Sequence, residues 1–399
     1  MKILFLAPHP VYQERGSPIA VKMVLGVMSL RRYEVDLVTY PEGESIDLPN
    51  VRFHRVPNLP FVRNMRPGFS VKKLICDFFM MFKIMSLVMR NRYQLVHAVE
   101  ESVFFALVLK ALFRLPFVYD MDSSLAQQMV EQKPRLRFLL PVLNALEGLA
   151  VKHAEVVIPV CDALGDIARS HAPKKITVLY DVPLLERNAG SAPERLRETL
   201  DIRGVMAMYV GNLEPYQGID LLLEGFALAA QRVSALDLVI IGGAAEDIEK
   251  YKQKAKDLGV EGRVHLLGPR PIKQLAGYLA QADMLVSPRI KGENTPMKIY
   301  SYLDSGKPVL ATNLRTHTQV LDGDTALLVP PRPKSLAAGL VRLARSEDLR
   351  RELGTSGKRL IQEKYNYPNF YSTLTGVLDE LNERFDLNAR EPVNAGNPR

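Results

Sequence analysis

A short stretch in the second half of the chain could bind a phosphate-bearing ligand. In residues 284–312 an apolar run predicts a strand, and a loop containing the acid Glu293 follows it. Thr295 and Pro296 then signal a helix start, and a second apolar run predicts the next strand. Ligands of open parallel sheets bind at the carboxyl ends of strands, and the free N–H groups of a helix start suit phosphate. We therefore predict that Glu293 lies beside such a ligand.

An earlier segment of the second half also predicts a loop between a strand and a helix. The segment YVGNLEPYQGID predicts a strand that ends at Gly211 and a helix that begins near Gly218. A glycine at each end lets the backbone approach a phosphate closely, and the same pattern also fits an ordinary turn between strand and helix. Both interpretations stay open on this pattern alone.

Acids and a histidine follow two predicted strands of the first half. Asp120 and Asp122 form a DxD motif, whose paired carboxylates could hold Mg²⁺ or Mn²⁺, although such short acidic motifs also arise by chance. His97, Glu100 and Glu101 come at the end of the run LVHAV and could line a binding site. The alternative is a strand-end histidine followed by a solvent-exposed helix start, where glutamate is favoured electrostatically.

Strand and helix patterns alternate along the whole chain. Strands that alternate with helices form parallel sheets covered on both faces, so the sequence predicts two doubly wound α/β domains. The predicted strands are 2–8, 34–40, 51–57, 95–99, 116–121, 156–160 and 176–180 in the first half, and 207–211, 237–243, 263–268, 284–288, 308–312 and 326–330 in the second. Helical patterns of the first half lie at about 18–31, 71–90, 102–113, 134–153 and 162–170.

A stretch rich in proline, glycine and charge separates the two halves. The domain organisation that we predict is 1–183 for the N-terminal domain, 184–204 for a linker, 205–365 for the C-terminal domain, 366–385 for a C-terminal helix and 386–399 for a disordered polar tail.

The composition is that of a folded globular protein. At 399 residues the chain is too long for one ordinary core, and 47% of its residues are hydrophobic and 24% charged. Cys76 and Cys161 lie far apart without metal-ligand spacing, so a reduced cytosolic compartment fits better than a disulfide framework. The start MKILFLAPHP lacks the small-residue cleavage site of a signal peptide and predicts a core strand. Asp77 and Lys83 interrupt the apolar run 74–89, which therefore does not predict a membrane span.

The net charge of +8 is concentrated in residues 52–92. This stretch holds nine Lys or Arg and one acid, and nine minus one equals the whole excess. Residues 71–90 also carry apolar side chains at helical spacing, which is typical of an amphipathic helix at an anionic membrane surface. A buried core helix is the alternative. Nucleic acid is disfavoured as a partner, because no recognition motif accompanies the charge.

Three segments of the second half resemble the donor-binding half of the retaining glycosyltransferases of family 4 (glycosyl transferases group 1). They are YVGNLEPYQGIDLLLEGF, residues 237–243 and PRIKGENTPMKIYSYLDSGKPVLAT. In the first half, LFLAPHPVYQERGSPIAV looks like the first strand and glycine loop of that family, and YQLVHAVEE and FVYDMDSS look like later strand ends. The resemblance covers about residues 1–385. It implies the B-type fold (GT-B), with two Rossmann-like domains facing a central cleft and a C-terminal helix that crosses back to the first domain.

The resemblance implies transfer of a sugar from a nucleotide diphosphate-sugar to an acceptor hydroxyl, with retention of configuration and without a cofactor. The donor is expected on the C-terminal domain and the acceptor on the N-terminal one. The first glutamate of the family signature falls on Glu293 and holds sugar hydroxyls. The second, which holds the ribose, falls on Ser301, and a serine offers one oxygen where a carboxylate offers two. The expected mechanism is front-face attack, in which a phosphate oxygen of the donor takes the acceptor proton.

Three further positions depart from the family pattern. Asn212 and Gln217 stand where the family commonly has an Arg and a Lys that neutralise the diphosphate, and Asp122 stands where it has a histidine. Because the leaving diphosphate gains negative charge in the transition state, other cations must compensate. Lys298 is the leading candidate, and the weaker ones, which also fit solvated surface residues, are Arg289, Lys291 and Arg15.

The expected site therefore has three parts and no metal. The catalytic residues are Glu293, Asp122 and Lys298. The donor-binding residues are Gly211, Asn212, Gln217, Gly218, Arg270 (near the nucleobase), Asn294, Thr295, Pro296, Met297 and Ser301. The residues expected on the acceptor side or in the cleft are Arg15, Gly16, Ser17, His97 and Asp120.

The expected function is a glycosyltransferase of cell-surface polysaccharide or glycolipid synthesis. We expect it in the cytoplasm, peripheral on the inner face of the membrane, with an anionic surface contacted through residues 52–92 and a glycan or lipid-linked acceptor. The missing Arg, Lys and Glu favour an alternative, a catalytically impaired nucleotide-sugar-binding scaffold of the same fold, which the retained Glu293 opposes. A Rossmann-type oxidoreductase is excluded, because no GxGxxG follows the first strand.

Overall fold

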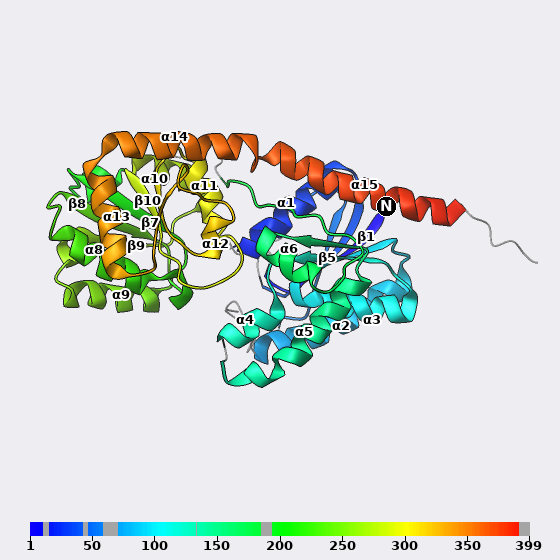
Figure 1. Cartoon of the computed structure of the whole chain (residues 1–399). Coiled ribbons are helices and arrows are strands. Elements are labelled where there is room, and N and C mark those ends of the chain that lie inside the picture. The colour runs from blue at the N-terminus through cyan, green and yellow to red at the C-terminus, as the bar shows by residue number, and fades with distance from the viewer. Residues whose placement is uncertain (11–15, 43–46, 59–70, 133, 185–193, 391–399) are drawn as a thin grey trace, which may run out of the picture. The chain divides into compact units, whose positions relative to one another are not determined.

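The chain forms two compact units. The structure, a computed structural model, describes residues 1–10, 16–42, 47–58, 71–132, 134–184 and 194–390 (Figure 1). The first unit comprises Met1–Tyr180 with Phe370–Arg399, and the second comprises Asp181–Asn369. Arg15, residues 185–193 of the expected linker and the last nine residues of the tail lie outside the described residues.

The first unit is built on a parallel six-stranded sheet in the order β3-β2-β1-β4-β5-β6. Its strands are β1 (Lys2–Ala7), β2 (Glu34–Thr39), β3 (Val51–Arg55), β4 (Leu95–Val99), β5 (Phe117–Met121) and β6 (Val156–Pro159). β4 and β5 are buried at every residue, because helices cover both faces of a parallel sheet. The strand order reverses between β1 and β4, and ligands of such sheets bind at the carboxyl ends of the strands at this point.

Helices pack on the sheet of the first unit. They are α1 (Gly16–Leu30), α2 (Val71–Arg90), α3 (Val103–Phe113), α4 (Leu125–Gln132), α5 (Leu140–His153), α6 (Asp162–Arg169) and the C-terminal α15 (Tyr367–Arg390), with the 3₁₀ turns η1 (Glu100–Ser102) and η2 (Pro134–Leu139). Met80 of α2, Leu109 of α3 and Val151 of α5 share one hydrophobic cluster with Leu4 and Leu6 of β1. Because alternate residues of a strand point to opposite faces, these three helices cover the same face of the sheet.

The C-terminal helix α15 is tied to the first unit by charged contacts. Asp379 pairs with Arg31 and accepts a hydrogen bond from the Tyr33 hydroxyl at 3.3 Å. Arg384 pairs with Glu155 at 3.0 Å. The part of α15 from residue 370 onward therefore belongs to the N-terminal unit, although it follows the second unit in the sequence.

The second unit has a parallel six-stranded sheet in the order β12-β11-β10-β7-β8-β9. Its strands are β7 (Val205–Val210), β8 (Leu236–Ile241), β9 (Val264–Gly268), β10 (Met284–Ser287), β11 (Val309–Thr312) and β12 (Leu327–Val329). Its helices are α7 (Leu196–Thr199), α8 (Ile219–Ala230), α9 (Ala245–Asp257), α10 (Leu275–Gln281), α11 (Lys298–Asp304), α12 (Arg315–Thr318), α13 (Pro333–Arg345) and α14 (Glu347–Glu363). Here the order reverses between β7 and β10, which places the loops after these two strands at the switch point.

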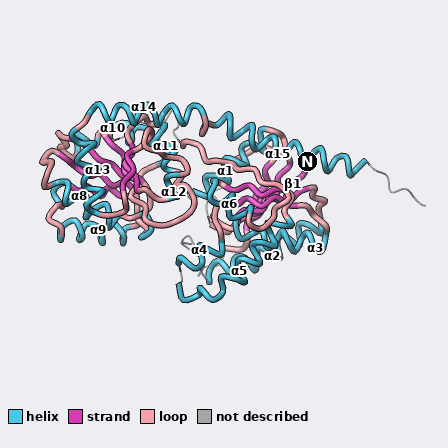
Figure 2. The backbone as a smooth tube through the Cα atoms, viewed as in Figure 1, coloured by secondary structure: helices cyan, strands magenta, loops and turns pink. Residues whose placement is uncertain are grey.

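Twelve of the thirteen predicted strands are present, and strands and helices alternate as expected (Figure 2). The exception is 176–180, where Ile176 forms one isolated bridge to Val157. The reason lies in Pro159, which has no N–H group with which to continue the ladder beside this segment. The helix predicted at 134–153 is divided into η2 and α5.

Two of the predicted domain boundaries differ from those of the structure. The described end of the expected linker, from residue 194, groups with the second unit and contains α7, whose Leu196 N–H donates to Gln281 Oε1 at 2.7 Å. The C-terminal helix continues to Arg390, so the first five residues of the expected disordered tail are helical. Cys76 and Cys161 are both buried, and neither forms a disulfide within the described residues. No helix in the described part of the chain has the length and hydropathy needed to span a membrane.

Candidate functional site

The two loops at the switch point of the second unit pack against each other. Gly218, which ends the loop after β7, has φ of +75°, and a Cβ there would lie 2.1 Å from the carbonyl oxygen of Pro288. The N–H group of Ile290 donates to the carbonyl of Tyr216 at 3.0 Å. Only glycine meets both demands at position 218, so its place in the sequence reflects the close approach of the two loops.

Lys298 reaches from the start of α11 to the end of β7. Its Nζ donates to the Tyr209 hydroxyl at 2.8 Å and to Gln217 Oε1 at 3.1 Å, and lies 3.9 Å from the centre of the Tyr209 ring. A Cβ on Gly211 would come within 2.6 Å of this nitrogen. The missing side chain of Gly211 therefore makes room for the Lys298 ammonium.

The Lys298 amine has no acidic partner within the described ranges of the chain, and it contacts the neutral side chains of Tyr209 and Gln217. Burial, together with the nearby positive charge of Arg289, holds the pKa of Lys298 well below its ordinary value. Desolvation disfavours the charged form of a lysine, and an adjacent negative charge restores it. This position is therefore one that an anionic ligand would stabilise.

Arg289 shapes the loop that carries Glu293. Its Nε donates to the carbonyl of Lys291 at 2.7 Å, and its two terminal nitrogens donate to the carbonyl and the side-chain oxygen of Asn294 at 3.1 and 2.9 Å. Gly292, with φ of +110°, lies over the guanidinium, where a Cβ would meet a nitrogen at 2.3 Å. The guanidinium donors are thus engaged with the loop itself, so Arg289 positions the loop.

The same loop is also held by the last residue of β11 and by the segment that follows this strand. Gln319 donates to the carbonyl of Glu293 at 2.9 Å, and Thr316 donates to the carbonyl of Asn294 at 2.6 Å. Thr312 donates to the carbonyl of Arg289 at 2.5 Å. Sequence reasoning missed these three supports, because their side chains act on backbone atoms far away along the chain.

His317 is a further buried support of this edge. Its Nε2 lies 2.9 Å from the Ser287 hydroxyl, and its Nδ1 lies 2.8 Å from the carbonyl of Thr312. Burial lowers the pKa of His317 to about 4, so the imidazole is neutral at physiological pH. It thus links the ends of β10 and β11 without adding charge to the site.

The residues between Glu293 and α11 form a tight approach to the helix. The helix begins at Lys298, two residues after Pro296, and Asn294 and Met297 lie in this approach. Thr295 is buried, and its hydroxyl has no hydrogen-bond partner among the residues that the structure describes. Buried hydroxyls are normally satisfied, so this one is available to a ligand.

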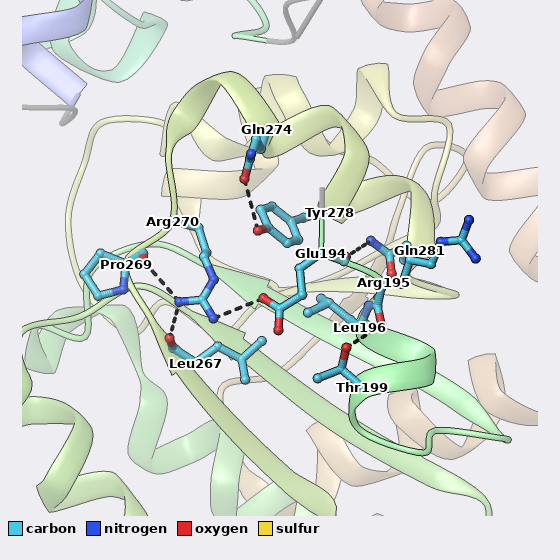
Figure 3. Close-up of polar contacts among 10 residues, drawn as sticks. All are labelled: Glu194, Arg195, Leu196, Thr199, Leu267, Pro269, Arg270, Gln274, Tyr278 and Gln281. Carbon is cyan, nitrogen blue, oxygen red and sulfur yellow. Dashed lines mark hydrogen bonds and ion pairs between the residues drawn. The ribbon is translucent and has the colours of Figure 1, made fainter. Parts of the chain in front are cut away.

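Two expected donor contacts are engaged within the fold. Ser301 is 1% exposed, and its hydroxyl accepts a hydrogen bond from the N–H group of Leu184 at 3.0 Å. Arg270 donates to the carbonyl of Leu267 at 2.6 Å and pairs with Glu194 at 3.2 Å, which holds the segment before α7 against the end of β9 (Figure 3). Both side chains stabilise segments that sequence reasoning assigned to the linker.

Two further departures from the family pattern lie in the loop after β7. Asn212 is exposed, and its carbonyl accepts a hydrogen bond from the Tyr209 hydroxyl at 2.6 Å. Gln217 is buried beside Lys298. Lys298 therefore brings a cation to the neighbourhood of position 217, where the expected lysine is missing. Lys291 is exposed.

In the first unit, His97 and Asp120 come together at the ends of β4 and β5. His97 Nε2 lies 2.9 Å from Asp120 Oδ2, and the imidazole stacks on the Phe5 ring with 4.4 Å between centroids. Both residues are buried, as is Asp122 two positions later. The DxD motif is thus partly used to orient a histidine. Within the described ranges, no group of three or more His, Cys, Asp or Glu side chains could hold a metal ion.

Glu100 is the conformationally strained residue of this edge. It has φ of +48°, in the left-handed region, and its Oε1 accepts a hydrogen bond from the Ser17 hydroxyl at 3.1 Å. Burial, reinforced by Glu101, raises the pKa of Glu100 to about 7. Backbone strain of this kind is concentrated at functional sites. Gly16 begins the helix that presents Ser17.

His9 and Lys73 were missed by sequence reasoning. His9 is buried after β1, and in the part of the chain that the structure describes neither ring nitrogen has a hydrogen-bond partner. Burial, with Lys73 adding to it, lowers the pKa of His9 to about 3. Lys73 pairs with Glu101 at 2.5 Å. The run APHP after the first strand was the available signal for His9.

Comparison with known proteins covers both units. The family model for Glycosyltransferase Family 4 matches residues 21–181, and the model for Glycosyl transferases group 1 matches residues 204–346. D-inositol 3-phosphate glycosyltransferase of Corynebacterium diphtheriae is 30% identical over 246 residues, which cover 59% of this chain and 55% of that protein. Lipopolysaccharide 1,2-N-acetylglucosaminetransferase of Salmonella typhimurium is 24% identical and covers 62% of this chain and 68% of its own length. The chain thus spans only about half the length of the Corynebacterium relative.

Solved structures agree on the fold. Sucrose-phosphate synthase from Thermosynechococcus elongatus superimposes with a TM-score of 0.79 at 18% identity, over 96% of this chain and 99% of the other. Anabaena HepE in complex with UDP-glucose gives a TM-score of 0.73 at 19% identity, over 95% and 100%. The two parallel sheets therefore define the GT-B fold. Because family models match both halves, the chain belongs to the family 4, group 1 glycosyltransferases.

Proposed function

We propose that the chain is a retaining glycosyltransferase that moves a sugar from a nucleotide diphosphate-sugar to an acceptor hydroxyl. The observation that carries the proposal is Lys298, a partly buried amine with neutral partners at the switch point of the second sheet. Such a position favours an anion, and a diphosphate leaving group supplies one. The glycosyltransferase from Corynebacterium diphtheriae supports glycosyl transfer, and the UDP-glucose complex of HepE supports a nucleotide-sugar as donor.

In this proposal Lys298 replaces the two cations that are missing at Asn212 and Gln217. The glycines at 211 and 218 let the backbone approach the diphosphate, and residues 294–297 line the donor where the loop leads into α11. Glu293 accepts hydrogen bonds from the hydroxyls of the transferred sugar. Ser301 contributes by fixing the segment at Leu184, so we propose that the ribose is bound by other groups. Arg270 holds the loop beside the nucleobase.

On the acceptor side we propose that Ser17, Glu100 and the His97–Asp120 pair bind the hydroxyl-bearing substrate, with Gly16 allowing close approach. Asp122, at the position of the family histidine, faces the transferred sugar in this proposal. The acceptor is a glycan or a lipid-linked glycan, as the lipopolysaccharide transferase of Salmonella typhimurium suggests by its name. The site of action is the inner face of the membrane, reached from the cytoplasm.

Donor hydrolysis tests the proposal. Purified protein is incubated with UDP-, GDP-, ADP- and TDP-sugars, with and without a metal chelator, and release of nucleoside diphosphate is measured. We expect slow release from at least one donor, unchanged by the chelator. Glu293→Gln should lower release by roughly 10²–10³-fold, while Glu352→Gln, at an exposed carboxylate of the same unit, should leave it unchanged.

Three results would count against this function. Release that Glu293→Gln leaves intact would refute the site. Donor binding without release would favour the catalytically impaired scaffold. Inhibition by the chelator would refute metal independence.

A further inference from the structure

We propose that the outer faces of α2, α3 and α5, with η2, form one docking surface for an anionic lipid bilayer. The proposal extends the expected membrane contact beyond residues 52–92. It rests on the proposed function only for the reason why the protein would act at a membrane. We call these outer faces the three-helix face.

Helix α2 is apolar on two opposite sides. Cys76, Met80 and Ile84 point into the core. On the other side Phe78 is 61% exposed and Phe82 is 60% exposed, and their rings contact edge to face at 4.8 Å. A core helix needs only one apolar stripe, so the second stripe requires another partner.

The same exposure continues on the helices that pack beside α2. In the described residues, eleven of the fourteen large apolar side chains that are exposed lie between residues 74 and 149. They are Leu74, Phe78, Phe82, Met89, Val108, Leu112, Phe113, Phe138, Val142, Leu146 and Leu149. α2, α3 and α5 cover one face of the same sheet and run together on one side of the first unit (Figure 1). The exposed side chains of these three helices therefore gather on that side. Apolar surface gathered in this way marks an interaction site.

The charges of the three-helix face are one-sided. α2, α3 and α5 contain two acids, Asp77 and Glu147, and both face inward. Asp77 accepts a hydrogen bond from the Tyr40 hydroxyl at 2.7 Å, and Glu147 is buried against Ser124. The exposed charges on these helices and their ends are all basic, namely Lys72, Arg90, Arg114, Arg137 and Lys152.

This combination favours a bilayer over a protein partner of the same chain. Exposed aromatic and aliphatic side chains with a basic rim enter the headgroup region of anionic membranes, where each cation gains attraction. A symmetric dimer through the same face would bring like charges together, because each copy contributes the same patch. The occupant that fits both the apolar area and the charge is therefore an anionic lipid surface.

Vesicle co-sedimentation tests the proposal with the full chain. We expect binding to phosphatidylcholine vesicles that contain phosphatidylglycerol, and weak binding to phosphatidylcholine alone. Phe78→Ser with Phe82→Ser should lower binding roughly tenfold or more, because two apolar side chains are lost from the bilayer. The matched control is Leu30→Ser, which removes an equally exposed apolar side chain of the first unit outside this face.

A second pair of variants tests the charge. Arg90→Glu with Lys152→Glu should weaken binding to anionic vesicles several-fold, while Lys256→Glu with Lys334→Glu should not. Absent binding, or binding that the variants at residues 78 and 82 leave unchanged, would overturn the proposal. A dimer in sedimentation velocity that these variants dissociate would assign the face to a second copy and would also overturn it. Donor release measured in lipid-free buffer separates this failure from failure of the proposed function.

Discussion

The carboxyl edges of the two sheets differ in charge, although the sheets have the same topology. At the edge of the second sheet, Lys298 lies among neutral groups with Arg289 nearby. At the edge of the first, the half-buried Glu100 accepts a hydrogen bond from the Ser17 hydroxyl, and the buried Asp120 pairs with His97. An edge with unmatched positive charge suits a diphosphate, and an edge rich in acceptors suits hydroxyl groups. In the proposed function, local side chains and not the shared fold thus distinguish the two roles.

The two edges also differ in their backbone conformation. In the second unit, glycine provides the space, as Gly211 does for the Lys298 amine. In the first unit, Glu100 itself adopts the left-handed conformation. Backbone strain is concentrated at functional sites, so Glu100 is the acceptor-side residue to test.

The largest expected effect is on the donor side. Glu293→Gln keeps the size of the side chain and removes its charge, so donor release should fall by roughly 10²–10³-fold, as when a preorganised electrostatic contact is lost from an active site. Nucleoside diphosphate release over time measures this. An equal loss of donor release in the exposed control Glu352→Gln would indicate damage to the fold and would contradict the assignment of Glu293 to the donor site.

A smaller effect is expected from Gly211→Ala. The added Cβ would stand 2.6 Å from Lys298 Nζ and must displace it, so affinity for the nucleoside diphosphate should fall by about tenfold, or about 1.4 kcal/mol. Calorimetric titration measures this. Gly262→Ala is the matched control, because a Cβ at 262 meets nothing within 4 Å. Equal affinity in the two variants would contradict the placement of Lys298.

The smallest expected effect is a pH-dependent shift in stability from Glu100→Gln. The folded pKa of Glu100 is raised from 4.5 to about 7, so its protonated form is favoured by folding. Its contribution to stability is fully present below pH 4.5 and is lost as pH rises through 7. Relative to the wild type, the variant should therefore gain a few degrees in Tm between pH 5 and pH 8. A difference in Tm that does not change with pH would contradict the burial of this carboxyl.

The sequence predicted the elements well and the side-chain contacts less well. Periodicity located the strands because buried parallel strands are short apolar runs, and the loop with Glu293 was found because it joins two such runs. Nothing local indicated that Ser301 would bond to Leu184 or that Arg270 would pair with Glu194, since both contacts join residues far apart along the chain. His9 was missed because its burial depends on packing.

Lys298 illustrates what could be predicted and what could not. Its position in the helix after Glu293 was evident from the sequence. Its lack of an acidic partner within the described residues emerges only when β7 and α11 are brought together. The general expectation that some cation replaces the missing Arg and Lys thereby becomes a specific expectation about Lys298.

The most direct test of the account is a comparison of wild type with Lys298→Met in both stability and ligand binding. Because burial disfavours the charged lysine, the variant should have a higher Tm without ligand. It should also bind the preferred nucleoside diphosphate about 10- to 100-fold more weakly, since charge-assisted hydrogen bonds are lost. Lys256→Met, at an exposed lysine, should change neither property. A Lys298→Met protein that binds the nucleoside diphosphate as tightly as the wild type would contradict the account.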